Sequence, residues 1–205
     1  MKIDWKEFAR KDSWDALLEA LPELSHMPGS PQNPKYHYAD VWGHTKDVLR
    51  HLAEEGWTDN SVVMASGLLH DAGKGLPGVR GVNKEGQPSD HGHERVSARM
   101  VPAAMDKLAP GTTATEVYAA AWLVANHMKL VFPIPGAEDK AGRFARQAFD
   151  ELAPKGLDAA RMLSWLLALY KADMLSTTTG LTEEGRAWIE ARVTALGRAF
   201  SEALR

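Results

Sequence analysis

The chain has 205 residues, of which 44% are hydrophobic and 25% are charged, and its formal net charge is -3. Such a length and composition are typical of one globular domain with a proper core. The small negative charge offers no overall attraction for a polyanion, so we expect no extended nucleic-acid surface. The sequence contains no cysteine. This excludes disulfides and thiolate metal sites and fits a cytosolic protein, in which any metal must be held by His, Asp or Glu.

The N-terminal residues alternate charged and aromatic side chains and lack the apolar stretch of a signal peptide. The most apolar segment, residues 162–170, is far shorter than the roughly 20 residues that a membrane-spanning helix needs. We therefore expect a cytoplasmic protein without a membrane partner.

Residues 1–35 show two patterns. Asp12 and Ser13 precede apolar residues at positions 14, 17 and 18, so we predict an N-terminal helix within 1–21. Residues 22–35 contain four prolines and predict an irregular connector. This connector is the best linker candidate, but we favour an N-terminal helix packed on the rest of the chain over a separate appendage. The prediction is one domain over 1–205.

A long helix is predicted from Asp40 onward, where Val41, Val48 and Leu52 recur at helical spacing. His44 lies on the same inward face. A single histidine in such a place is more often a core residue than a metal ligand, so its interpretation depends on residues elsewhere.

The stretch Leu68-Leu69-His70-Asp71-Ala72-Gly73-Lys74-Gly75 ends an apolar helix in two adjacent metal-type ligands, followed by a lysine between two glycines. Neighbouring residues on a helix point roughly 100° apart. A metal that touches both His70 and Asp71 therefore needs ligands from other parts of the chain.

Residues 76–89 are rich in glycine and proline, which predicts a loop over the site. The string Asp90-His91-Gly92-His93-Glu94-Arg95 follows. His93 begins a helix with apolar residues at 96, 100 and 101, so its ring can face inward. His91 has three interpretations: a substrate contact, a partner of a metal ligand, or a loop histidine.

The next two predicted helices carry His127 and a set of cations. His127 borders an apolar stripe that includes Val124, and alone it fits a structural role as well as a functional one. Lys140, Arg143 and Arg146 follow at a spacing of three, which places them on one side of a helix. We interpret that side as a solvated face.

Residues 157–175 are apolar nearly all round and predict a central buried helix. Asp173 lies one turn after Leu169. Because an unpaired buried carboxylate is costly, a metal ion or a cationic partner explains it best. A last helix from Thr182 is expected to bury five residues: Trp188, Ile189, Val193, Leu196 and Phe200. No convincing β alternation is present, so the predicted fold class is all-α, a single helical bundle.

The order of these residues along the chain is H…HD…H…H…D, which resembles the HD-domain metal-dependent phosphohydrolase superfamily. Two strings, Tyr36-His37-Tyr38-Ala39-Asp40-Val41-Trp42-Gly43-His44-Thr45 and His91-Gly92-His93-Glu94, resemble the HD domain of bacterial tRNA nucleotidyltransferases, the CCA-adding enzymes. The resemblance covers residues 36–128, with weaker support at Asp173. The family's His-His pair stands here as His127-Met128.

The resemblance implies one or two divalent metal ions. A first site would consist of His44, His70, Asp71 and Asp173, and a second of Asp71, His93 and His127, with Asp71 shared. Imidazole and carboxylate ligands are compatible with Mn²⁺, Fe²⁺, Co²⁺, Ni²⁺, Zn²⁺ or Mg²⁺ and do not distinguish among them. Lys74 follows the His-Asp pair after an alanine and a flexible glycine and is a candidate for catalysis and phosphate binding. Arg95 and His91 are further substrate-binding candidates.

The implied activity is hydrolysis, by metal-activated water, of a phosphomonoester or a 2′,3′-cyclic phosphodiester of a nucleotide or RNA end. The nucleotidyltransferase portion of the CCA-adding enzymes is not in this sequence, so we expect a free-standing hydrolase. One alternative is another HD nucleotide hydrolase, either a 5′-nucleotidase or a dinucleoside polyphosphate hydrolase. The other is a non-catalytic, nucleotide-binding regulatory module.

Overall fold

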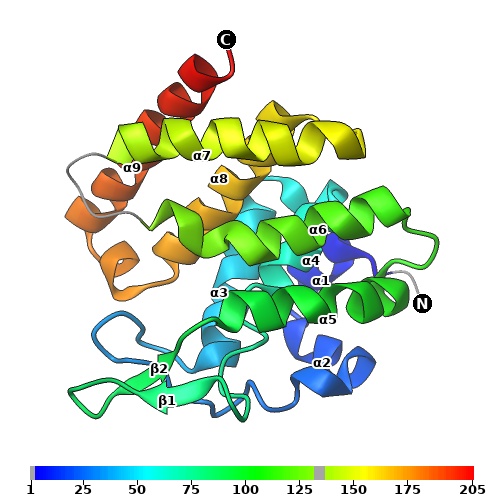
Figure 1. Ribbon diagram of the computed structural model, residues 1–205. Coiled ribbons are helices and arrows are strands. Elements are labelled where there is room, and N and C mark those ends of the chain that lie inside the picture. The colour runs from blue at the N-terminus through cyan, green and yellow to red at the C-terminus, as the bar shows by residue number, and fades with distance from the viewer. Residues whose placement is uncertain (1–2, 132–136) are drawn as a thin grey trace.

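The computed structural model of the protein describes residues 3–131 and 137–205, and most of these are helical (Figure 1). Two short helices come first, α1 (Trp5–Lys11) and α2 (Leu17–Ala20). The longer helices are α3 (Val41–Glu54), α4 (Ser61–Leu69), α5 (His93–Leu108), α6 (Ala114–Asn126), α7 (Ala137–Leu152), α8 (Ala159–Leu175) and α9 (Glu183–Ala203). The all-α prediction is confirmed. In the described ranges, none of the helices combines the length and apolarity needed to cross a membrane.

Helix α4 is the centre of the bundle. All its residues from 62 to 69 are buried, and α3, α5, α6 and α8 each pack against it. Asn60 caps its start, because the Oδ1 atom accepts a hydrogen bond from the Val63 amide at 3.2 Å. Gly67 permits close approach to α3, since a Cβ atom there would lie 2.5 Å from Leu52 Cδ1. The C-terminal end of α4 therefore lies deep inside the molecule.

Several helices begin where the sequence predicts. The carboxylates of Asp40 and Asp158 and the hydroxyl of Thr182 cap α3, α8 and α9 by accepting hydrogen bonds from backbone amides of the first turn. Helices α7 and α9 pack on each other and on α8, forming a layer beside the central bundle (Figure 1).

The N-terminal segment differs from the predicted helix over 1–21. Asp12 takes the left-handed conformation (φ 47°) and ends α1, and a 3-10 turn (Trp14–Ala16) then leads into α2. Trp5, Trp14 and Leu17 are buried in the same core as the bundle. The segment therefore packs directly on the rest of the chain.

Two local predictions are wrong. Residues 76–89 contain part of a hairpin rather than a plain loop, because β1 (Arg80–Val82) pairs antiparallel with β2 (Pro88–Asp90). Strands of three residues are too short to show a period-two pattern. In α9, Trp188 is 42% exposed, whereas Ile189, Leu196 and Phe200 are buried. Trp188 precedes Ile189 by one residue, and so points about 100° away from the buried side.

Candidate metal centre

Six ligand candidates from five elements meet at the C-terminal end of α4. They are His70 and Asp71 directly after α4, His44 in α3, His93 at the start of α5, His127 directly after α6, and Asp173 in the last turn of α8. All six are buried. The four other helices are those that pack on α4. Burial of their apolar faces therefore brings together ligand candidates that are distant in the sequence.

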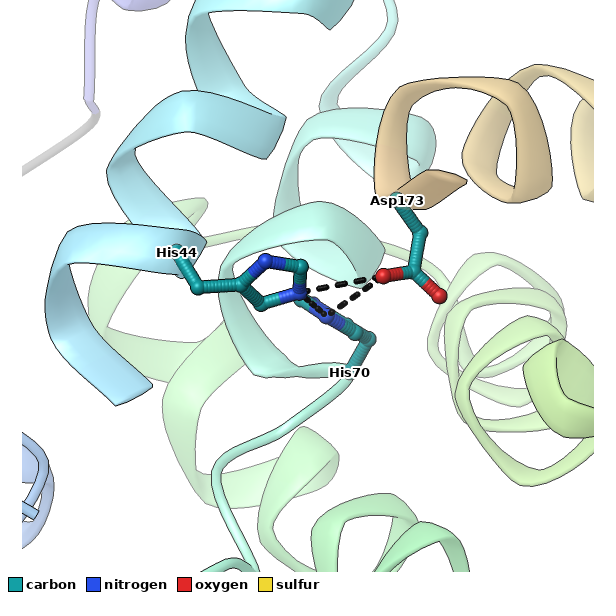
Figure 2. A group of neighbouring side chains, drawn as sticks. All are labelled: His44, His70 and Asp173. Carbon is teal, nitrogen blue, oxygen red and sulfur yellow. Dashed lines mark hydrogen bonds and ion pairs between the residues drawn. The ribbon is translucent and has the colours of Figure 1, made fainter. Parts of the chain in front are cut away.

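One group consists of His44, His70 and Asp173, whose side chains point toward one another (Figure 2). His44 Nε2 lies 3.0 Å from Asp173 Oδ1 and 3.2 Å from His70 Nε2. His70 Nε2 lies 3.9 Å from the same Asp173 oxygen. Two nitrogens and one carboxylate oxygen thus surround one point.

A second group consists of Asp71, His93 and His127. Asp71 Oδ1 lies 3.0 Å from His93 Nε2 and 3.8 Å from His127 Nε2. The other oxygen, Oδ2, lies 3.3 Å from His70 Nε2 and 3.6 Å from His44 Nε2. Asp71 therefore turns one oxygen toward each group of histidines, as a carboxylate shared by two ions would.

The backbone orients all four histidine rings. Each Nδ1 atom lies 2.7 to 3.1 Å from a carbonyl oxygen, that of Ser176 for His44, Gly67 for His70, Asp90 for His93 and Val124 for His127. A carbonyl oxygen can only accept, so each Nδ1 carries a proton and donates. This is the arrangement in which metal-binding histidines are usually held.

The same geometry shows that the site fits a cation. With the proton on Nδ1, the Nε2 atom of each neutral ring has a lone pair directed into the centre. His44 and His70 bring these atoms to 3.2 Å, and His93 and His127 bring them to 3.3 Å. Two lone pairs at this separation repel each other, and a positive charge between them removes the repulsion. Imidazole nitrogens and carboxylate oxygens are donors that suit a divalent metal ion.

Charges within the site keep the acidic ligands ionised. In the metal-free site, burial opposes protonation of His70, but Asp71 and Asp173 raise its pKa, so this ring can take a second proton. Burial alone would raise the pKa of Asp71, but the charge of the protonated His70 and that of Lys74 outweigh it and hold that pKa well below its usual range. Burial also opposes ionisation of Asp173, yet the hydrogen bond with His44 and the charge of His70 lower its pKa. Burial lowers the pKa of His127 to about 3, so this ring stays neutral near pH 7.

Lys74 lies between the site and the connector. Its Nζ atom is 2.7 Å from Asp71 Oδ2 and donates to Gln32 Oε1 at 2.8 Å. Gln32 is itself held by the carbonyls of Ala39 and Asp40, each 3.3 Å from its Nε2 atom. Sequence reasoning missed Gln32, because it stands in the irregular connector and no periodic pattern marks it.

The loop that carries Lys74 is braced on two sides. The Gly73 amide donates to Ser97 Oγ at 2.8 Å, and a Cβ atom on Gly73 would lie 2.6 Å from the carbonyl oxygen of His93. The Gly75 amide donates to the Asp90 carboxylate at 2.9 Å, which also pairs with Arg80. Asp90 of the hairpin thus makes two contacts: its carboxylate holds the loop, and its backbone carbonyl orients the His93 ring.

A cavity of about 840 Å³ opens onto both groups and onto Lys74. His91 lines it, as the substrate-contact interpretation requires, but Arg95 does not, and the Arg95 side chain is 82% exposed. Arg95 follows the inward-facing His93 by two residues, about 200° around the helix. The cavity also includes His37, whose ring lies edge-on to His44 with the centroids 4.7 Å apart. Sequence reasoning did not propose His37 as a site residue, although it lies in the string 36–45 that carries the resemblance to the CCA-adding enzymes.

Comparisons with known proteins point to the same segment. Residues 41–177 match the family described as HD domain. The Multifunctional CCA protein of Herminiimonas arsenicoxydans is 35% identical over 94 residues, which cover 45% of this chain and 21% of that protein. The A-adding tRNA nucleotidyltransferase of Deinococcus radiodurans is 32% identical over 128 residues, which cover 62% of this chain and 28% of that protein. The chain thus spans only about a quarter of these curated relatives. No solved structure matches significantly.

Proposed function

This chain belongs to the HD-domain family, and we propose that it hydrolyses the phosphomonoester or 2′,3′-cyclic phosphodiester of a nucleotide or an RNA end. Membership of the family implies metal-dependent phosphohydrolase-type activity. The observation that carries the proposal is the buried Asp71 carboxylate, which presents one oxygen to each of two groups of histidines beside an open cavity.

When bound, a divalent ion would supply an activated water and stabilise negative charge on the phosphate oxygens. His44, His70 and Asp173 would hold one ion, and His93 and His127 a second, with Asp71 shared. The carbonyls behind the four rings keep their Nε2 atoms aimed inward. Imidazole and carboxylate donors suit Mn²⁺, Fe²⁺, Co²⁺, Ni²⁺, Zn²⁺ or Mg²⁺.

Lys74 is the proposed phosphate-binding residue. Its ammonium group is in the lining of the cavity and is positioned by Gln32 and Asp71. An ammonium group binds a phosphate oxygen as a point charge, which favours both the bound ester and the charge that builds up during its hydrolysis. His91, on the exposed side of the cavity, is a further substrate contact.

The size and lining of the cavity support a nucleotide-sized substrate. Its volume of about 840 Å³ is in the range of about 300–1,000 Å³ that holds small organic ligands and cofactors. Beyond the charged groups, Tyr36, Met128 and Val131 line it with apolar surface that is 42 to 53% exposed. Such surface suits the base and sugar that carry the phosphate. The relatives are named for CCA and for tRNA, which also favours this substrate class.

The test is a reconstitution assay. Protein stripped of metal is loaded with each of the six ions in turn and given 2′,3′-cyclic nucleotides, nucleoside 2′-, 3′- and 5′-monophosphates and dinucleoside polyphosphates. We expect hydrolysis of a cyclic or 2′- or 3′-ester to return with at least one ion and to stop with a chelator. Full activity under chelation would contradict the metal dependence. Hydrolysis of only 5′-nucleotides or dinucleoside polyphosphates would indicate the other class of HD hydrolase. Nucleotide binding without hydrolysis would indicate a regulatory module.

A further inference from the structure

A second, separate hollow is lined by basic side chains. Its volume is about 400 Å³. The lining consists of Asn126, Lys129, Lys140, Arg143, Phe144, Gln147, Ala148 and Glu151. We call Lys129, Lys140 and Arg143 the basic pocket. All three are exposed, and two side-chain amides stand beside them as further hydrogen-bond donors.

The lining of this hollow carries an excess of positive charge, because it contains three cations and one carboxylate. None of its three cations forms an ion pair with a carboxylate of residues 3–131 or 139–205. Glu151, the carboxylate in the lining, accepts a hydrogen bond from the Tyr118 hydroxyl at 3.1 Å. By contrast, Lys107 pairs with Glu23, and Lys171 pairs with both Glu55 and Glu190. Positive charge is therefore concentrated locally on a chain whose net charge is -3.

The position of the basic pocket connects it to the metal centre. The 3-10 turn His127–Leu130 carries His127 and Met128, which line the catalytic cavity, and Lys129, which lines the basic pocket. One short turn thus separates the two hollows. On α7, Lys140 and Arg143 are three residues apart, about 4.5 Å along the helix axis, and Arg146 follows at the same spacing beside a third hollow that Arg143 also lines.

We propose that the basic pocket binds the sugar-phosphate backbone of a single-stranded RNA whose terminal phosphate occupies the catalytic cavity. This inference rests on the proposed function and selects an RNA end over a free nucleotide as the substrate. Exposed lysine and arginine side chains bind phosphates independently of base sequence and release counterions. A mononucleotide bound in the catalytic cavity has no second phosphate to place in the basic pocket. The sequence analysis interpreted the side of α7 with Lys140 and Arg143 as a solvated face, and this proposal gives that side RNA phosphates as its ligand.

The test compares two substrates with the same reacting end: a nucleoside 2′,3′-cyclic phosphate and a ten-nucleotide RNA that ends in that nucleotide. The variant is Lys140→Glu/Arg143→Glu. The control is Arg99→Glu/Arg161→Glu, which makes the same charge change at two exposed helical residues outside both hollows. We expect the pocket variant to lower kcat/KM for the RNA about tenfold or more, and to change the ratio of RNA to mononucleotide activity far more than the control does.

Binding of a fluorescent ten-nucleotide RNA with a 3′-hydroxyl provides a measurement that does not need turnover. Loss of two phosphate contacts should make the slope of log affinity against log salt shallower by about 1.4. Equal effects of the pocket and control variants, in both binding and kcat/KM, would overturn the inference, as would equal wild-type kcat/KM for the two substrates. If neither substrate is hydrolysed but RNA binding falls only in the pocket variant, the proposed function fails and the RNA site stands.

Discussion

Replacing Asp71 with alanine should affect both groups of ligands at once. The carboxylate approaches His93 at 3.0 Å through one oxygen and His70 at 3.3 Å through the other, so its loss removes a negative ligand from each. Loss of even a residue that only orients a ligand costs about 10 to 100-fold in metal affinity or activity. Removal of a ligand shared by two ions should therefore lower turnover by about 10²- to 10⁴-fold, equivalent to about 3 to 5 kcal/mol.

The fold should survive this change. Helix α4 is held by the burial of residues 62–69 rather than by the carboxylate. Breaking a buried ion pair can cost about 3–5 kcal/mol, but Lys74 lines an open cavity and keeps its hydrogen bond to Gln32. We therefore expect a smaller loss of stability and an unchanged helical circular-dichroism spectrum.

The assay measures kcat/KM on the best substrate and the number of ions bound per chain at saturating metal. Wild-type protein should bind two ions. Asp173→Asn alters only the first group of ligands, so it should mainly lower the affinity for one of the two ions. Asp71→Ala should lower the affinity for both ions. Wild-type turnover and two tightly bound ions in Asp71→Ala would refute the assignment of Asp71 as the shared ligand. One ion per wild-type chain would instead show that His93 and His127 serve substrate or structure.

Three further outcomes follow from the geometry. Lys74→Ala should keep the metal content but lower kcat/KM about 10 to 100-fold, because a charge-assisted phosphate contact of about 1.5–3 kcal/mol is lost; metal analysis beside kinetics checks this, and loss of metal would contradict it. Gly73→Ala should lower the free energy of unfolding by about 1–3 kcal/mol, since the added Cβ atom would lie 2.6 Å from the His93 carbonyl oxygen. An unchanged denaturation midpoint would contradict the close approach of Gly73 to His93. In metal-stripped protein, His127 has a folded-state pKa of about 3, below its ordinary value of 6.5. The unfolded chain therefore binds the proton first, and stability should fall as the pH drops from 6.5 toward 3, by about 1.4 kcal/mol per pH unit for this residue. His127→Asn should show a shallower dependence in urea titrations, and an identical slope would contradict the lowered pKa.

Much of the helical framework could be predicted because the signals are local. The caps Asp40 and Thr182 and the apolar run of α4 stand next to the residues they organise, so a short window contains the information. The hairpin of β1 and β2 was not predicted, because strands of three residues are too short to show a period-two pattern. The outward direction of Arg95 could have been predicted, since helix geometry places it about 200° from His93.

The all-α class and the residue types able to hold a metal were predictable from the sequence, because apolar periodicity and the chemistry of His and Asp are properties of single segments. Tertiary structure alone decided how those residues meet. The carbonyl that orients His44 belongs to Ser176, and the side-chain amide oxygen that positions Lys74 belongs to Gln32. The two oxygens of Asp71 face different groups of histidines because four helices pack around α4. The basic pocket likewise exists only where the turn after α6 lies against α7. Each of these contacts joins segments distant in the chain, and their direction depends on packing, which no local pattern encodes.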